Sequence, residues 1–272
     1  MWKIKTCKLR WEEEEMGMIS ENNIYEGFGK DGKPGTKGKA GDNGSGFTER
    51  AKDGDKGTAG DTNTWGQCDP KPGNGTDGTS GGNAGSGTDG VKGTDGSDGS
   101  DGATLILHVN QSDTIEIDYH GGDGGDGGDG GDGGSGGNGQ GGGNGGEAGD
   151  RNDCGSSASQ GIGGNGGNGG NGGHGGNGGN GGNGGNGGNI TIIYEDERPE
   201  VYPNPSNGLS GGIGGVGGNS GNGGCAGTGG SGGSGRTAGT AGNAGKPGDN
   251  GTVGEAGHTG NPAVLSLIKN KG

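Results

Sequence analysis

Hydrophobic residues make up only 19% of this 272-residue chain, and aromatic residues only 3%. An ordinary globular domain is about 45–50% apolar, so a conventional core of this size is excluded. No apolar run is long enough to span a membrane. The N-terminal stretch MWKIKTCKLRWEEEE also lacks the apolar centre of a signal peptide.

Basic charge and catalytic motifs are scarce as well. The formal net charge is −15, which argues against nucleic acid as a partner. No glycine-rich loop is followed by the Gly-Lys-Ser/Thr of a phosphate site. The four histidines lie in separate segments, so their spacing indicates no nucleophile–base pair. We therefore expect no cofactor and no enzymatic activity.

Glycine is abundant, with 89 residues, and it recurs with a period of three. The run from 161 to 189 reads GIGGNGGNGGNGGHGGNGGNGGNGGNGGN. Polyproline II, or polyglycine II when the residues are glycine, has three residues per turn and no internal hydrogen bonds, so every third side chain falls on one edge. Backbone groups on the bare edges then need partners on adjacent segments. The expected asparagine column consists of Asn165, Asn168, Asn171, His174, Asn177, Asn180, Asn183, Asn186 and Asn189.

Similar glycine runs occupy residues 29–60, 75–102, 121–149, 208–235 and 239–260. The β-rich segments 104–109, 114–119, 190–194 and 263–268 lie between or after these runs, as does a weaker one at 2–9. We expect each glycine run to form one straight rod. If successive rods alternate in direction, these strands meet at one end of the bundle. The sequence therefore predicts a mostly irregular chain forming an antiparallel bundle of about six polyglycine-II helices, capped by one small β-sheet.

The expected domains follow from this layout. Residues 1–28 form an N-terminal strand and acidic linker, and residues 29–262 form the bundle with β insertions at 103–120 and 189–202. Residues 263–272 supply a strand to the cap, whereas 195–207 is expected to be a Pro-rich loop. Gly-Gly-X runs suit positions with neighbours on two edges, so 121–149 and 161–189 are placed centrally and the first and last rods at the margins. The last reversal is expected near 235 or, alternatively, within 221–230.

Stretches such as GKDGKPGTKGKAGDNG look like collagen Gly-X-Y, but collagen needs about 15–20% Pro or hydroxyproline and this chain has 8 prolines. GGHGGNGGNG (172–181), the other triplets and the interrupting cysteines resemble the snow flea antifreeze proteins, which are six-rod polyglycine-II bundles. That resemblance implies an ice-binding face of small residues. The nearest match consists of Thr237, Ala238, Thr240, Ala241, Ala244, Thr252 and Val253, interrupted by charges at Lys246, Asp249 and Glu255.

The GGD repeat (121–132) places Asp123, Asp126, Asp129 and Asp132 in an aspartate column with a spacing of about 9 Å. One reading is a row of divalent-cation sites. The reading we favour is a solvated acidic edge, because one carboxylate per turn cannot supply the six to eight oxygens that Ca²⁺ prefers. The metal candidates are therefore weak.

The four cysteines, Cys7, Cys68, Cys154 and Cys225, are disulfide candidates with three connectivities. Disulfides would imply an extracellular or cell-surface location. The expected function is that of a non-enzymatic structural protein, a rigid acidic rod that builds fibres or surface layers by self-association through β-cap edges. The alternatives are an ice-binding protein acting through a flat face and a receptor-binding adhesin, as in some bacteriophage tail fibres. Ice or a surface polymer is the corresponding ligand.

Overall fold

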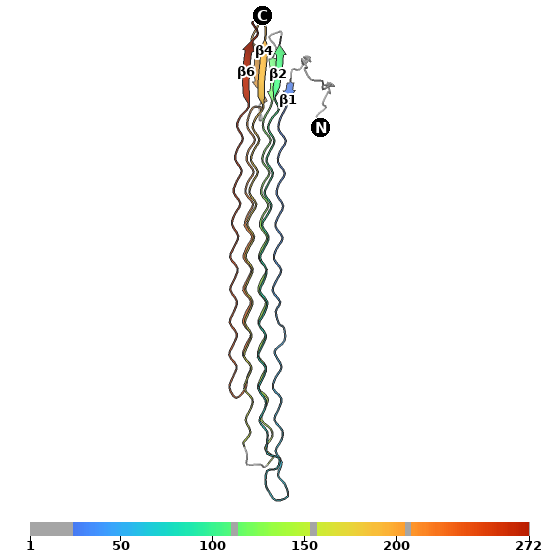
Figure 1. Cartoon of the computed structure of the whole chain (residues 1–272), viewed down its shortest axis with the longest axis vertical. Coiled ribbons are helices and arrows are strands. Elements are labelled where there is room, and N and C mark those ends of the chain that lie inside the picture. The colour runs from blue at the N-terminus through green and yellow to red at the C-terminus, as the bar shows by residue number, and fades with distance from the viewer. Residues whose placement is uncertain (1–23, 110–113, 153–156, 205–207, 272) are drawn as a thin grey trace, which may run out of the picture.

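The protein is a long, thin rod with a β-sandwich at one end, as a computed structural model shows for residues 24–109, 114–152, 157–204 and 208–271 (Figure 1). All strands of these described residues lie in the sandwich, which we call the cap. The remainder consists of extended segments without regular secondary structure, which we call rods 1 to 6. The rods span 27–60, 71–102, 119–150, 157–188, 208–235 and 238–262.

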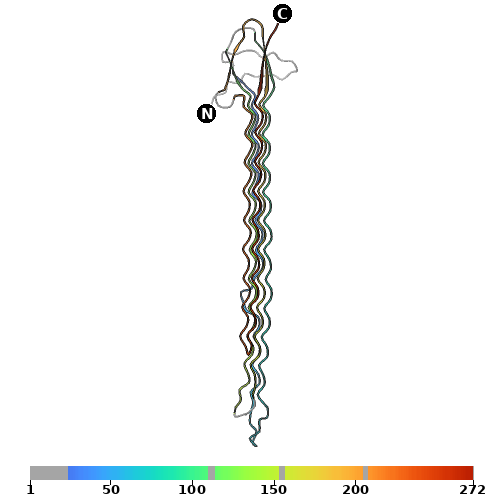
Figure 2. The same cartoon turned by 90° about the vertical axis from the view of Figure 1, so that its left-hand side faces the viewer.

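The rods lie in two layers, which are seen edge-on in Figure 2. Rods 1, 3 and 5 run away from the cap and form one layer, whereas rods 2, 4 and 6 return and form the other. Within the first layer, the amide of Gly32 donates to the carbonyl of Asp123 (2.6 Å), and the amide of Gly124 donates to Ile213 (2.8 Å). The same pattern recurs every three residues. Inter-rod bonds therefore replace the internal bonds that such segments lack.

Hydrogen bonds between the layers define a staggered arrangement. Rod 3 is bonded to rods 1 and 5 in its own layer and to rods 2 and 4 in the other. Rod 4 likewise has four neighbours. Among the described residues, rod 1 is bonded to rods 2 and 3 alone, and rod 6 to rods 4 and 5 alone. The expected central placement of the Gly-Gly-X runs, with the first and last rods at the margins, is therefore confirmed.

Glycine is required in the central rods because backbones approach one another closely. A Cβ at Gly128 would lie 2.1 Å from the carbonyl oxygen of Thr36 on rod 1, and one at Gly124 would lie 2.0 Å from that of Gly182 on rod 4. Rod 3 therefore needs glycine at two of every three positions. Only the third position can carry a side chain, and it faces outward.

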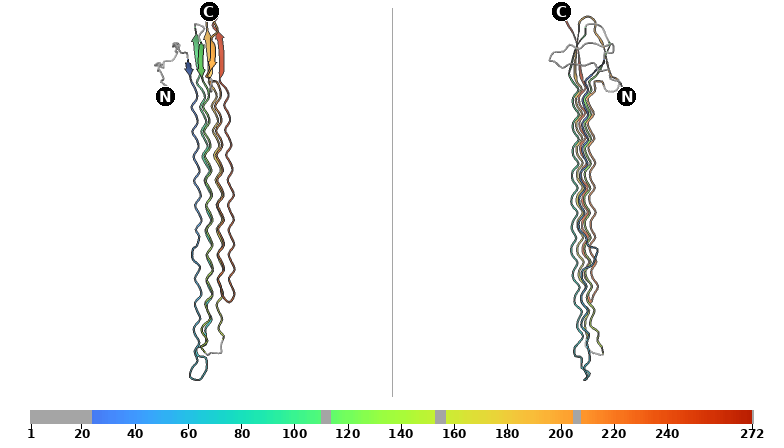
Figure 3. Two further views of the ribbon diagram at one scale, coloured as in Figure 1. Left: turned by 180° about the vertical axis from the view of Figure 1, so that it is seen from behind. Right: turned by 90° about the vertical axis from the view of Figure 1, so that its right-hand side faces the viewer.

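The cap contains two parallel three-stranded sheets with opposite strand directions. One sheet has the order β1-β3-β5 and the other the order β2-β4-β6. The β2-β4-β6 sheet is labelled in Figure 1, and the cap is seen from behind in Figure 3. The strands are β1 (Ile24–Glu26), β2 (Leu105–Val109), β3 (Thr114–Asp118), β4 (Asn189–Tyr194), β5 (Glu200–Pro203) and β6 (Val264–Lys269). The core between the sheets comprises Leu107, Val109, Ile115, Ile117, Tyr119, Ile190 and Ile192.

The predicted fold class is wrong as stated. The described residues contain no helix, so no bundle of helices is present, and the cap is two parallel sheets rather than one. The reason is the layering, because rods that alternate in direction also alternate between layers and each layer feeds its own sheet. The four strands expected between 104 and 268 are present as β2, β3, β4 and β6. The expected strand at 2–9 lies outside the described residues.

Two further expectations need correction. The segment 195–207 was expected to be a loop, yet it contains β5, which pairs with β3 through Val201 and Ile115. The alternative reversal within 221–230 is wrong, because rods 5 and 6 remain bonded from Gly212–Gly260 to Gly233–Gly239. The chain reverses at 235–237, short of the distal end of the molecule (Figure 3).

Candidate functional site: polar columns on the rod faces

The aspartate column forms hydrogen bonds with the neighbouring rod. Oδ1 of Asp126 accepts a bond from the amide of Val216 on rod 5 at 2.8 Å. Asp123, Asp129 and Asp132 bond the amides of Ile213, Asn219 and Asn222 in the same way. These amides point outward and cannot reach another backbone, so the carboxylates satisfy them. The expected solvated edge therefore also holds rod 5 in register.

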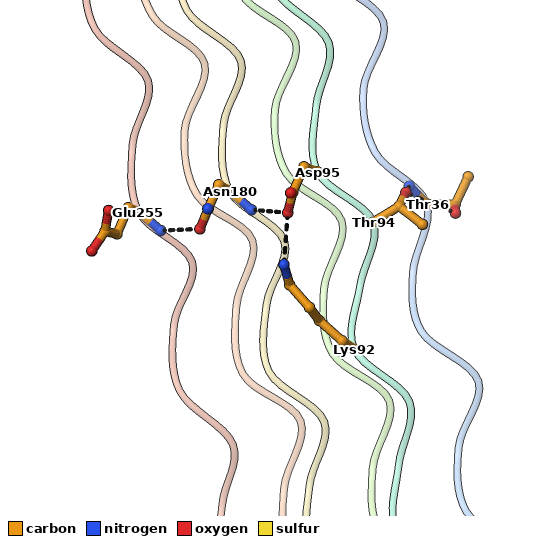
Figure 4. A network of polar contacts seen from close by, with 6 residues as sticks. All are labelled: Thr36, Lys92, Thr94, Asp95, Asn180 and Glu255. Atoms are coloured by element: carbon orange, nitrogen blue, oxygen red, sulfur yellow. Dashed lines mark hydrogen bonds and ion pairs between the residues drawn. The ribbon is translucent and has the colours of Figure 1, made fainter.

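The asparagine column has the same role in the second layer. Oδ1 of Asn180 accepts from the amide of Glu255 on rod 6 at 3.0 Å, while the amide of Asn180 donates to Oδ1 of Asp95 on rod 2 at 2.8 Å (Figure 4). Asn180 thus accepts a hydrogen bond from rod 6 and donates one to rod 2. The members that accept from rod 6 are Asn165, Asn168, Asn171, His174, Asn177, Asn180, Asn183 and Asn186.

His174 replaces asparagine in this column, as expected. Its Nδ1 accepts from the amide of Asp249 at 3.1 Å, the same bond that each neighbouring asparagine makes. An acceptor one bond beyond Cγ is therefore what the position requires, and an imidazole supplies it.

Lys92 reinforces the network that Figure 4 shows. Its Nζ lies 2.9 Å from Oδ1 of Asp95, the oxygen that also accepts from Asn180. The amide hydrogen bond from Asn180, followed by the hydrogen bond from Lys92, lowers the pKa of Asp95 from its usual value.

A hydroxyl column on rod 2 performs the corresponding task for rod 1. Oγ1 of Thr94 accepts from the amide of Thr36 at 2.7 Å (Figure 4). Val91 interrupts this column and offers no acceptor to the amide of Lys39, for which the described residues provide no other hydrogen-bond acceptor. The column consists of Thr76, Thr88, Thr94, Ser97 and Ser100.

The metal reading gains no support from the geometry. Within the described parts of the chain, no three His, Cys, Asp or Glu side chains gather as a metal would require. The four carboxylates of the aspartate column are spread along rod 3, each with its own amide partner. The sequence could not indicate these amide partners, because they depend on which rod lies alongside rod 3.

The ice-face candidates on rod 6 divide between two columns. Thr240 and Thr252 share a column with charged residues, and their amides bond Asn165 and Asn177. Ala241 and Ala244 belong to the next column, which contains no charge, and Thr237 lies at the 235–237 reversal. The uncharged column comprises Ala241, Ala244, Pro247, Asn250, Val253, Ala256 and Thr259.

That uncharged column lies beside another on rod 5, because Oδ1 of Asn250 accepts from the amide of Gly223 (2.9 Å). Ile213, Val216 and Val253 are 66%, 67% and 64% exposed. We call the two columns together the uncharged surface. Its rod 5 members are Ile213, Val216, Asn219, Asn222, Cys225, Thr228, Ser231 and Ser234.

The cysteines differ in state. Cys68 is disulfide-bonded, whereas Cys225 is a free, exposed thiol on rod 5. Cys7 and Cys154 lie outside the described residues. Cys68 and Cys225 are therefore not paired with each other.

A polar cluster joins the cap to the rods. Asp118, only 9% exposed, lies 2.5 Å from Nδ1 of His120 and accepts a bond from Nδ2 of Asn204 at 3.2 Å. The imidazole of His120 stacks on Phe28 with the ring centroids 5.2 Å apart. This cluster could not be predicted from the sequence, because its residues come from three separate segments.

Comparisons with known proteins yield one weak similarity. No family model and no curated protein match the chain. Among solved structures it is similar to a springtail antifreeze protein from Granisotoma rainieri, described as a bundle of nine polyproline type II helices. The identity is 29%, over 61% of this chain and 94% of that one, and the TM-score of 0.10 is too low to carry an argument. Nor do the described residues form any helix able to cross a membrane.

Proposed function

We propose that the protein is a non-enzymatic structural protein, a rigid acidic rod that holds its cap at a fixed distance from its distal end. The observation that carries this proposal is the use of the polar columns. The Asp and Asn side chains of these columns, which a binding or catalytic site could otherwise use, are engaged with the amides of the next rod. Because these hydrogen bonds repeat along the length of the rods, they favour a stiffening role over the binding of a ligand.

The acidic balance supports the same role. The carboxylates of the aspartate column satisfy rod 5 through one oxygen and leave the other for solvent. A net charge of −15 keeps such rods apart in solution. Stiffness and solubility then come from the same residues.

Small-angle X-ray scattering tests this function. We expect the scattering of one straight, thin rod, with a longest dimension that is the same at low and high salt. Scattering typical of a flexible chain, or a length that contracts when salt screens the charge, would contradict a rigid spacer.

Ice binding is the second candidate, and the uncharged surface is the observation that favours it. This surface runs along rods 5 and 6 without a charged side chain, and Ile213, Val216 and Val253 are exposed on it. Thermal hysteresis of the wild type is compared with that of Val216→Lys and of Ala40→Lys on rod 1. Ice binding predicts activity that Val216→Lys abolishes and Ala40→Lys preserves, whereas absence of hysteresis in the wild type would exclude this candidate.

A further inference from the structure

Strand β6 lies at the margin of the cap, and no described strand pairs with its outer backbone edge. It pairs with β4 on one side only. The amides of Val264 and Asn270 donate toward β4, to Gly188 and Tyr194. Because alternate residues of a strand point the same way, the backbone groups of Leu265, Leu267 and Lys269 point outward.

Four of the six side chains of β6 are apolar, and none of the six is fully covered. Val264 and Ile268 are 59% and 50% exposed on the outer face. On the inner face, Leu265 and Leu267 pack against the core beside a groove that Val201 borders. A long apolar edge without charge before Lys269 is a template for pairing with another strand.

The remaining edges of the sheets are less open. Strand β1 has three residues, and β5 ends in Pro203. The stagger of the rods leaves β6 projecting beyond β5, just as β1 projects beyond β2. If a second copy paired antiparallel through β5 or β2, the projecting strand of the other sheet in one copy would therefore collide with the same strand of the second copy. Among the described strands, β6 is the long edge that a partner can reach.

The rods determine which orientation a partner can take. In rod 3, a Cβ at Gly122 would lie 2.1 Å from the carbonyl oxygen of Lys30, so this position must be glycine for a rod to lie alongside. The equivalent positions of rod 1 carry Lys30 and Lys33, and the outer column of rod 6 includes Pro247. A second copy lying parallel, side by side, is therefore blocked along its whole length. An antiparallel copy joined at the cap avoids this contact because its rods point away.

We propose that β6 pairs with β6 of a second copy of this chain, antiparallel and about a two-fold axis at Leu267. The six strands β2-β4-β6 and their counterparts then form one continuous sheet, and the rods extend in opposite directions. Leu267 pairs with its counterpart, and Leu265 lies opposite Lys269 of the second copy. Such an isologous contact closes on itself. This pairing rests on the proposed structural role and names the partner as a second copy of the chain. The resulting dimer would be about twice as long as the monomer.

Sedimentation velocity of the full chain, from about 1 µM to about 500 µM at two salt concentrations, tests the pairing because a small interface is expected to be weak. We expect a monomer that converts to a dimer as concentration rises, more readily at high salt because the negative charges are screened. Ile268→Lys places a cation in the paired edge and should weaken dimerisation at least tenfold. Ile106→Lys is the matched control, since Ile106 is 60% exposed at the other edge of the same sheet.

Scattering from the dimer separates end-to-end from side-by-side association. A longest dimension about twice that of the monomer is expected for a two-fold dimer joined at the cap. A monomer at every concentration, a dimer of unchanged length, or a dimer lost in Ile106→Lys but kept in Ile268→Lys would each overturn the proposal. A straight monomeric rod that does not dimerise would overturn only the pairing, whereas a flexible monomer would overturn the proposed function itself.

Discussion

Short side chains with an acceptor oxygen hold this molecule in register. Asparagine and aspartate carry that oxygen one bond beyond Cγ, within reach of the outward amide of the adjacent rod. Asp126 on rod 3 and Asn180 on rod 4 make this bond at 2.8 and 3.0 Å. Where no rod follows, the requirement ends, and rod 5 carries Ile213 and Val216 instead.

Removing one acceptor should cost stability, whereas removing its charge should not. Asp126→Ala leaves the amide of Val216 to water and should lower the free energy of unfolding by about 0.5–1 kcal/mol. Asp126→Asn keeps Oδ1 and should stay near wild type. Chemical unfolding followed by circular dichroism measures both variants. Equal losses would show that charge, as in a cation site, is what matters at this position.

Restoring a missing acceptor should have the opposite effect. Val91 interrupts the hydroxyl column and is 54% exposed. Val91→Thr supplies an oxygen to the amide of Lys39 and should stabilise the fold by about 0.5–1 kcal/mol. The thermal midpoint should rise, and Val91→Ala serves as the control that supplies no acceptor. A midpoint no higher in Val91→Thr than in Val91→Ala would argue against the column's role.

Asp95 provides a pH-dependent contribution with a defined sign. Its pKa is lowered in the folded state, chiefly by the amide of Asn180 and then by Lys92. The ionised form therefore adds stability that is present above the unfolded pKa of about 3.9 and is lost as pH falls through the folded pKa. NMR titration of the Asp95 carboxyl carbon should give a midpoint below about 3.9. A midpoint at or above that value would contradict the hydrogen-bond assignment.

Rods and strands depend on different residues. Each rod is held by contacts that tolerate no Cβ on the inner edges, whereas the cap is held by a small apolar core. Ile117 and Ile192 are fully buried in that core. Different substitutions should therefore destabilise the rods and the strands.

A single alanine should distinguish an inner from an outer position of the same rod. Gly128→Ala would place Cβ 2.1 Å from the carbonyl oxygen of Thr36 and should cost about 2–3 kcal/mol through forced displacement of rod 1. The neighbouring Asp129→Ala loses only its hydrogen bond to Asn219 and should cost about 1 kcal/mol or less. Calorimetric melting compares the two, and similar midpoints would contradict the close packing.

Much of the arrangement of elements can be predicted from where apolar residues interrupt the glycine period. TLILHV, TIEIDY and NITIIY each stand at a rod end, so β2, β3 and β4 could be predicted. Strand β5 could not, because Glu200 and Pro203 suggest a loop and pairing with β3 is what makes the segment a strand. The division into two sheets could not be predicted either, because it depends on how the rods are layered. Likewise, the aspartate column was visible as a pattern, but its amide partners depend on the layering.

At the scale of the whole molecule, the described rods end at two margins, and both margins carry side chains that keep a further rod from lying alongside. Rod 1 has Lys30 and Lys33 where a further rod would need glycine, and rod 6 has Val253 and Pro247. Bonding across the layers is continuous from the cap to the reversals. The molecule is therefore expected to behave as one stiff body whose growth is stopped at both margins.

Amide hydrogen exchange measured by NMR at single glycines tests this account most directly. Amides of the central rods that donate to a neighbouring rod, such as that of Gly124 to rod 5 and that of Gly166 to rod 6, should be strongly protected. Those of Gly214 and Gly217 on rod 5 have no acceptor among the described residues and should exchange rapidly. Strong protection of Gly124 and Gly166 together with rapid exchange of Gly214 and Gly217 would support the layered, hydrogen-bonded rods. Uniformly fast exchange of all four amides would contradict them.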